Sequence, residues 1–163
     1  MRHAVGMEFS VAGLLVSLAI LAPNLLLLAW PPRDQPKPVP STGFALSAAE
    51  RAGQAGCLVA PALTGGPPHL DGWLLLLVVF VGAYWALWLR YLLTGRRFAR
   101  LYEPLGPIPV PMAVFPVLAF AATAGWLGTW WLAAATVVLA VGHLPTAWII
   151  RTWLIRRSLG RTS

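Results

Sequence analysis

The chain has 163 residues, of which 58% are hydrophobic and only 10% are charged. A soluble domain carries about 45–50% apolar and about 25% charged residues, so this composition excludes an ordinary soluble globule and a disordered tail. The net charge of +7 does not indicate nucleic-acid binding, because the basic residues lie beside apolar runs. The single cysteine, Cys57, excludes a disulfide framework and a cysteine-based zinc site. We therefore expect a membrane protein whose main partner is the lipid bilayer.

The first uncharged run, about 9–30, is long enough to cross a bilayer core, which takes about 20 mostly apolar residues. The proline-rich segment 31–40 follows it and predicts a stiff, extended connector. The next segment, about 47–63, has two interpretations. Ser47 followed by Glu50 is a capping-box pattern, which predicts a helix that begins near Ser47. We expect this helix to cross the membrane, and the alternative is an amphipathic or re-entrant helix in an external loop.

Three further spans are predicted at about 72–92, 110–126 and 129–150. The region 104–150 carries no Asp, Glu, Lys or Arg and is too long for one crossing. Its break is expected at 125–131, because glycines permit a tight reversal and tryptophans prefer the membrane interface. A basic loop, 93–109, and a basic tail, 151–163, complete a single transmembrane domain, 1–163. The expected fold class is all-α, a polytopic helical bundle with five spans, or four if the second segment does not cross.

Arginines set the expected orientation. One cluster follows the third predicted span and another follows the last one: Arg90, Arg96, Arg97, Arg100, and Arg151, Arg156, Arg157, Arg161. Arginine and lysine are retained on the cytoplasmic side, so both clusters and the C-terminus are expected there, with the protein in the inner (plasma) membrane. Five spans place the N-terminus outside and the proline-rich connector inside, whereas four spans reverse both.

The same arginines suggest contact with anionic lipid headgroups, here assigned to Arg96, Arg97, Arg100, Arg156 and Arg157. The alternative is that they are topology determinants with solvated ends.

Polar side chains inside a membrane are costly and are therefore the first candidates for function. Helix rise places several of them at one height in the cytoplasmic half of a five-span bundle, which predicts an inward-facing polar pocket. Its candidate ligand-binding residues are Asn24, Glu50, Gln54, Arg90 and His143. The alternative is that these groups only hydrogen-bond between helices. No catalytic motif, metal-ligand set or cofactor motif is present in the sequence, so no catalytic residue, metal or cofactor is predicted.

Several short local patterns span most of the chain: Ala22-Pro23-Asn24-Leu25-Leu26 with Pro31-Pro32, Glu50-Arg51 with Gln54 and Cys57, Tyr84-Trp85 with Trp88 and Arg90-Tyr91, Pro109 and Pro111-Met112-Ala113 with Phe115-Pro116, and Gly142-His143 with Pro145. Together they resemble small multi-pass bacterial integral membrane proteins of uncharacterised type. The resemblance implies a helical fold in a membrane and transfers no catalytic or binding residue.

The function expected first is a non-enzymatic membrane protein whose pocket binds or helps to move a small or lipidic ligand. Two alternatives remain open. One is a membrane-embedded enzyme that uses Glu50 and His143 as acid and base on a lipid-soluble substrate. The other is a structural subunit of a homo-oligomer or of a larger membrane complex. An enzyme requires the two groups within about 2.6–3.2 Å beside a ligand-sized cavity, whereas a carrier requires only the cavity.

Overall fold

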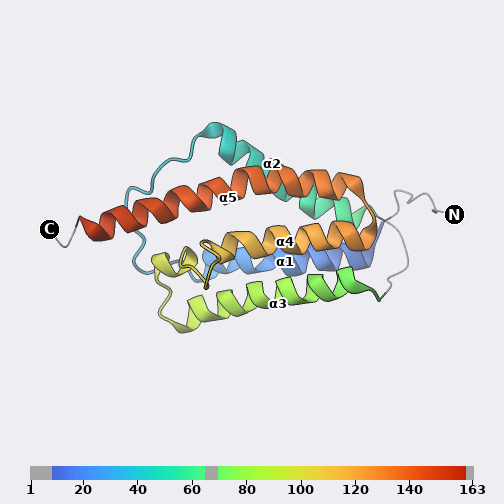
Figure 1. Cartoon of the computed structure of the whole chain (residues 1–163), viewed down its shortest axis with the longest axis horizontal. Coiled ribbons are helices and arrows are strands. Elements are labelled where there is room, and N and C mark those ends of the chain that lie inside the picture. The colour runs from blue at the N-terminus through green and yellow to red at the C-terminus, as the bar shows by residue number, and fades with distance from the viewer. Residues whose placement is uncertain (1–8, 65–69, 161–163) are drawn as a thin grey trace.

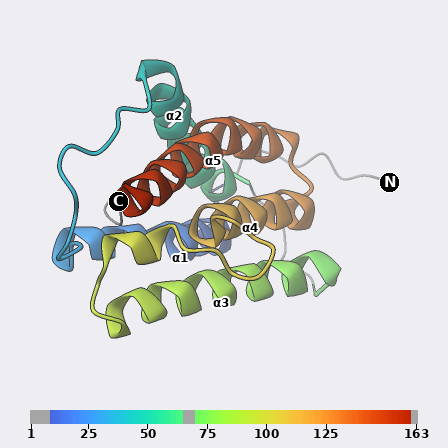
Figure 2. The same ribbon diagram turned by 60° about the vertical axis from the view of Figure 1, so that its left-hand side comes forward.

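The computed structural model describes residues 9–64 and 70–160. Within these residues the protein is all-helical, with five α-helices and one short 3₁₀ turn. The helices are α1 (Val11–Ala29), α2 (Phe44–Ala62), α3 (Gly72–Leu93), α4 (Pro111–Leu127) and α5 (Trp130–Leu159), and the turn η1 is Phe98–Leu101. Consecutive helices run in opposite directions along one bundle, and α3 lies on the far side of it from α2 and α5 (Figures 1 and 2).

Local signals explain most of the helix ends. Ser10 accepts a hydrogen bond from the Gly13 amide at 3.1 Å and caps α1, and Asp71 accepts one from the Leu74 amide at 3.0 Å and caps α3. The break predicted within 125–131 is confirmed: α4 ends at Leu127 and α5 begins at Trp130. Gly128 makes this reversal at φ 63°, a left-handed conformation that glycine adopts without a Cβ penalty.

Two predicted boundaries are wrong. The helix predicted from Ser47 begins at Phe44, so Ser47 lies one turn inside it and its hydroxyl donates to the Gly43 carbonyl at 3.0 Å instead of capping. The segment after 150, predicted as a tail, continues α5 to Leu159. Arginines have good helix propensity and suit a helix C-terminus, so the charged end of the sequence extends the helix. Arg161 and the N-terminal residues 1–8 lie outside the described residues.

Small residues set the closest contact, between α2 and α5. Gly53 faces the backbone of Leu139, and Gly142 faces the backbone of Glu50, with no room for a Cβ at either glycine. Farther along, the Cys57 Sγ lies 3.9 Å from the Thr136 hydroxyl. Such small faces let helices approach closely where the hydrophobic effect cannot drive their association.

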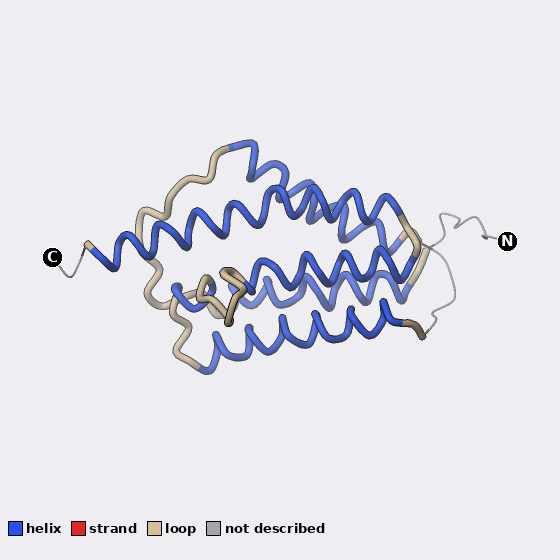
Figure 3. Tube along the Cα trace, viewed as in Figure 1, coloured by secondary structure: helices blue, strands red, loops and turns tan. Residues whose placement is uncertain are grey.

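The helix ends sort into two groups. The Ser10 amide donates to the Ala62 carbonyl at 2.8 Å, which joins the start of α1 to the end of α2. At the other end, the Arg33 amide donates to the Arg96 carbonyl at 3.0 Å, which joins the proline-rich connector to the loop between α3 and α4. Figure 3 shows the connecting segments gathered at the two ends of the bundle. The end that holds the connector, the α3–α4 loop and the last turns of α5 is called the arginine end below.

Three helices are long and apolar enough to span a membrane: α1, α3 and α5, with mean hydropathies of 2.4, 2.1 and 1.7. Helix α4 is also apolar but has only 17 residues. Large apolar side chains cover the outside of the bundle, for example Leu75 and Val78 on α3 and Val141 on α5, with exposed fractions of 65%, 61% and 56%. A surface of this kind fits lipid chains better than water, as a membrane protein requires.

Candidate functional site

Two of the five predicted ligand-binding residues meet in the structure. The His143 Nδ1 lies 2.6 Å from the Glu50 Oε1, and their side chains are 25% and 22% exposed. Helix α5 supplies the histidine and α2 the carboxylate, and the missing side chain of Gly142 lets the two helices come close enough for this contact. A nitrogen–oxygen distance this short requires a proton between the two atoms, so the pair is a short hydrogen bond between helices.

The other three predicted residues lie apart from this pair. Asn24 accepts a hydrogen bond from the Tyr84 hydroxyl at 2.7 Å, which links α1 to α3. Arg90 lies 3.5 Å from Glu103, a residue of the α3–α4 loop. Within residues 9–64 and 70–160, Gln54 makes no side-chain hydrogen bond. The bundle therefore places Glu50 with His143 in one interhelical contact and Asn24 in another, while Arg90 pairs with a loop residue and Gln54 joins none of these contacts.

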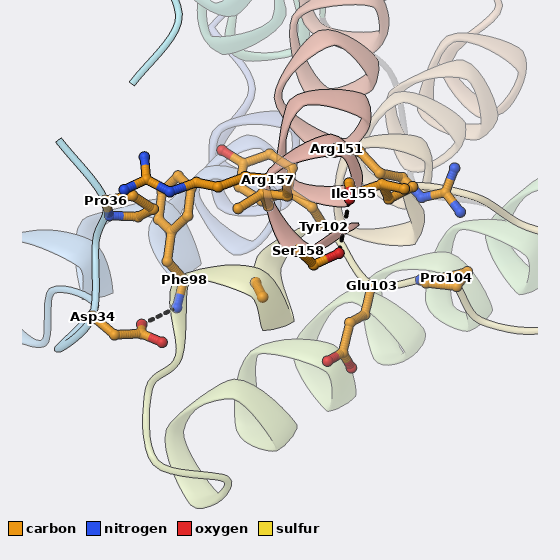
Figure 4. A pocket seen from close by; sticks show the side chains of 12 residues that line it. Asp34, Pro36, Phe98, Tyr102, Glu103, Pro104, Arg151, Ile155, Arg157 and Ser158 are labelled. Atoms are coloured by element: carbon orange, nitrogen blue, oxygen red, sulfur yellow. Dashed lines mark hydrogen bonds between the residues drawn. The ribbon is translucent and has the colours of Figure 1, made fainter. Parts of the chain in front are cut away.

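A cavity of about 560 Å³ opens at the arginine end. Three segments that are distant in the sequence line it: the connector with Asp34, the η1 region with Phe98 and Tyr102, and the end of α5 with Arg151 and Arg157. Figure 4 shows these side chains around one space, with Arg157 beside Pro36 and Phe98. Aromatic and aliphatic side chains form much of the wall, and the charged lining residues are Asp34, Glu103, Arg151 and Arg157.

The two carboxylates of this cavity already have partners. The Phe98 amide donates to the Asp34 Oδ1 at 2.6 Å, as the dashed line in Figure 4 marks. Glu103 accepts from Arg100 at 2.7 Å and from Arg90 at 3.5 Å. Glu103 is therefore paired with arginines of α3 and of the α3–α4 loop, whereas Asp34 is held by a neutral backbone amide and keeps its charge.

The two guanidinium groups of the cavity have no such partner. The Arg151 Cζ lies 5.3 Å from the centre of the Trp148 ring, and the Arg157 Cζ lies 5.2 Å from that of Trp153. Among the described residues, neither arginine forms an ion pair with a carboxylate. A cation–π contact fixes an arginine in place without neutralising it, so both groups keep their capacity to bind an anion.

Tyr102 connects the cavity to the pair between the helices. Burial, and to a smaller extent the negative field of Glu50, raises the pKa of Tyr102 to about 12. The phenol therefore stays neutral and adds no negative charge to a cavity that holds two unpaired arginines.

Of the five arginines predicted to contact lipid headgroups, Arg157 lines the cavity. Arg100 is held by Glu103, and Arg96 contributes its backbone carbonyl to the connector. Sequence reasoning placed none of Asp34, Phe98 and Tyr102 in a binding site, because they reach the cavity only when the connector folds against the α3–α4 loop. The sequence identifies Arg151 only as one of the arginines that follow the last predicted span.

In the part of the chain that the structure describes, no three His, Cys, Asp or Glu side chains come together to hold a metal ion. No protein-family model matches the chain, and no curated protein or solved structure matches it.

Proposed function

We propose that the chain is a five-span protein of the plasma membrane, with its C-terminus in the cytoplasm, that binds an anionic amphiphile in the cavity at the arginine end. The single observation that carries this proposal is the charge distribution around the cavity. Arg151 and Arg157 line it without a carboxylate partner, while Glu103 is paired with Arg90 and Arg100 and Asp34 accepts the Phe98 amide. A phosphate or carboxylate group would supply the missing counter-charge to either guanidinium group, and the aromatic wall would accept apolar carbon.

The arrangement of the helices supports the five-span topology. Helix α2 has 19 residues, about 28 Å at the usual helical rise, and its two ends lie at opposite ends of the bundle. Its charged residues, Glu50 and Arg51, fall in the half nearer the arginine end. The connector, the α3–α4 loop and the end of α5 share that end, so the positive-inside rule assigns them all to the cytoplasm.

Binding is tested by comparing two adjacent arginines. Arg157→Gln and Arg156→Gln remove the same charge from the same helical turn, but only Arg157 lines the cavity. We expect Arg157→Gln to weaken binding of dihexanoylphosphatidylglycerol to the purified full chain by about tenfold, since charge-assisted hydrogen bonds are stronger than neutral ones. Arg156→Gln should change it by less than about threefold, as expected for long-range attraction alone. Equal losses in the two variants would contradict a site at this cavity.

A second candidate function is supported by the 2.6 Å contact between Glu50 and His143. That geometry satisfies the distance requirement for an acid–base pair in a membrane-embedded enzyme. Neither residue lines the arginine-end cavity, however, so binding there does not place a substrate on the pair. The variant Glu50→Gln separates the two candidate functions. If the cavity is a binding site, this variant should bind dihexanoylphosphatidylglycerol as the unmodified chain does. If the pair acts on a lipid-soluble substrate, the variant should lose that turnover.

A further inference from the structure

A second hollow, here called the α4–α5 groove, lies beside the cavity and is entirely apolar. It has a volume of about 460 Å³ and is lined by the start of α4 and the middle of α5, including Val114, Leu144, Pro145 and Trp148. Prolines contribute to its shape, because Pro145 lies within α5 and Pro109 precedes α4. Trp148 is 46% exposed at its wall, so the groove faces whatever surrounds the bundle.

Residues of α5 and of the α3–α4 loop line both the groove and the cavity. Arg151 lines the cavity, and its guanidinium stacks at 5.3 Å on Trp148, which lines the groove. The small core cluster of Val110, Ala113 and Ala147 contributes to the wall between the two spaces: Tyr102 of the cavity packs against it, and so do Val114 and Leu144 of the groove.

The order of these features along the membrane normal matches the order of groups in a phospholipid. Arg151 lies at the boundary where the uncharged part of α5 ends, with Arg157 farther out and Trp148 and Leu144 farther in. An anionic headgroup belongs at the level of the arginines, and an acyl chain belongs at the level of the apolar groove. A protein helix would match the groove but would leave both guanidinium groups without a counter-charge.

We propose that the cavity and the α4–α5 groove form one binding site for an anionic phospholipid, with its phosphate on Arg151, the rest of its headgroup extending into the cavity toward Arg157, and one acyl chain against Val114, Leu144 and Trp148. This inference rests on the proposed function and names the ligand class of that same site. The chain contact makes the site selective for a lipid of the membrane over a soluble phosphate. Arg151 holds the phosphate at the point where the headgroup region meets the chain region.

The test fills the groove without touching the arginines. Val114→Trp should weaken binding of dioleoylphosphatidylglycerol to the purified full chain, measured by native mass spectrometry, by about tenfold, or about 1.4 kcal/mol. The same variant should bind glycerol 3-phosphate as the unmodified chain does. Val79→Trp is the matched control, because Val79 is 53% exposed on α3, on the other side of the bundle, and this variant should bind the lipid normally. Leu144→Phe, a smaller filling of the same groove, keeps the test informative if Val114→Trp does not fold.

The outcomes separate this inference from the function on which it rests. If Arg157→Gln weakens lipid binding but both groove variants bind dioleoylphosphatidylglycerol normally, the chain contact is wrong and the anion site stands. If Arg157→Gln has no greater effect than Arg156→Gln, the anion site itself is wrong. If the groove variants instead change the oligomeric state while lipid binding is unchanged, the groove is an interface between copies of the chain and the lipid inference is overturned.

Discussion

Glu50 and His143 place two ionisable side chains in a region where most neighbours are apolar. Their 2.6 Å contact satisfies one donor and one acceptor that would otherwise be left unpaired between α2 and α5. Leaving either group alone in this position is costly, because lipid and apolar side chains offer no replacement partner. The pair therefore contributes to helix association whatever further role it has.

A double-mutant cycle on this pair measures that contribution. Glu50→Ala and His143→Ala should each lower the stability of the purified protein, and the double variant should lose less than the sum of the two. We expect an interaction free energy of about 0.6–2 kcal/mol, the range for polar contacts between membrane helices. Unfolding in a denaturing detergent series gives the four free energies. Strict additivity of the two single effects would show that the side chains do not interact in the membrane.

Residue-level reasoning from the sequence identified this pair because both residues are rare polar groups and because helix rise placed them at similar depth. The same reasoning missed the partner of Asn24, since Tyr84 lies on a helix that is adjacent to α1 in space but far from it in sequence. Depth along a helix can be counted from the sequence, whereas the direction that a residue faces depends on how the helices pack. For this reason the predicted residues divided among several contacts.

At the scale of elements, the lengths of apolar runs predicted four of the five helices and most of their ends, and a capping pattern predicted the fifth, α2. The error at α2 arose because Ser47 and Glu50 fit a capping pattern that the backbone did not use. Gly43 instead caps the helix at φ 84°, so the helix begins at Phe44, three residues before Ser47, and the Ser47 hydroxyl donates back to the Gly43 carbonyl. A capping pattern such as that of Ser47 competes with other possible helix starts nearby. Here the glycine that precedes it, Gly43, lets the helix begin earlier.

The contact between α2 and α5 depends on glycine at specific positions. Gly53→Ala forces a methyl group against the backbone of Leu139, so the helices must separate, and we expect a loss of about 1–3 kcal/mol in unfolding free energy. Gly82→Ala on α3 is the matched control, because a Cβ there meets nothing within 4 Å. That control should leave stability unchanged or raise it by up to about 1 kcal/mol, as alanine is the better helix former. Comparable losses at both positions would contradict a glycine-dependent contact.

At the scale of the whole molecule, the cavity exists because three separate segments converge on one end of the bundle. The Asp34 carboxylate receives the Phe98 amide, so the proline-rich connector is attached to the loop between α3 and α4. The sequence of neither segment predicts this contact, because it needs only one aspartate side chain and one backbone amide, and both groups are common. The distribution of arginines predicted which ends of the chain share a side of the membrane, and only the folded bundle relates them to a cavity.

The number of spans can be measured at two connecting segments. In a Cys57→Ser background, cysteines introduced at Ser41, Leu70 or Ser158 report the side of the membrane on which each segment lies. Ser41 follows the connector, Leu70 precedes α3 and Ser158 lies at the end of α5, and all three are exposed.

If α2 crosses, an impermeant maleimide added to intact cells should label Leu70→Cys and spare both Ser41→Cys and Ser158→Cys until the membrane is opened. If α2 does not cross, Ser41→Cys and Leu70→Cys will be labelled alike, because both then lie in one external loop. That result would separate the connector from the arginines of α5 by the width of the bilayer, and the cavity that requires them together could not form.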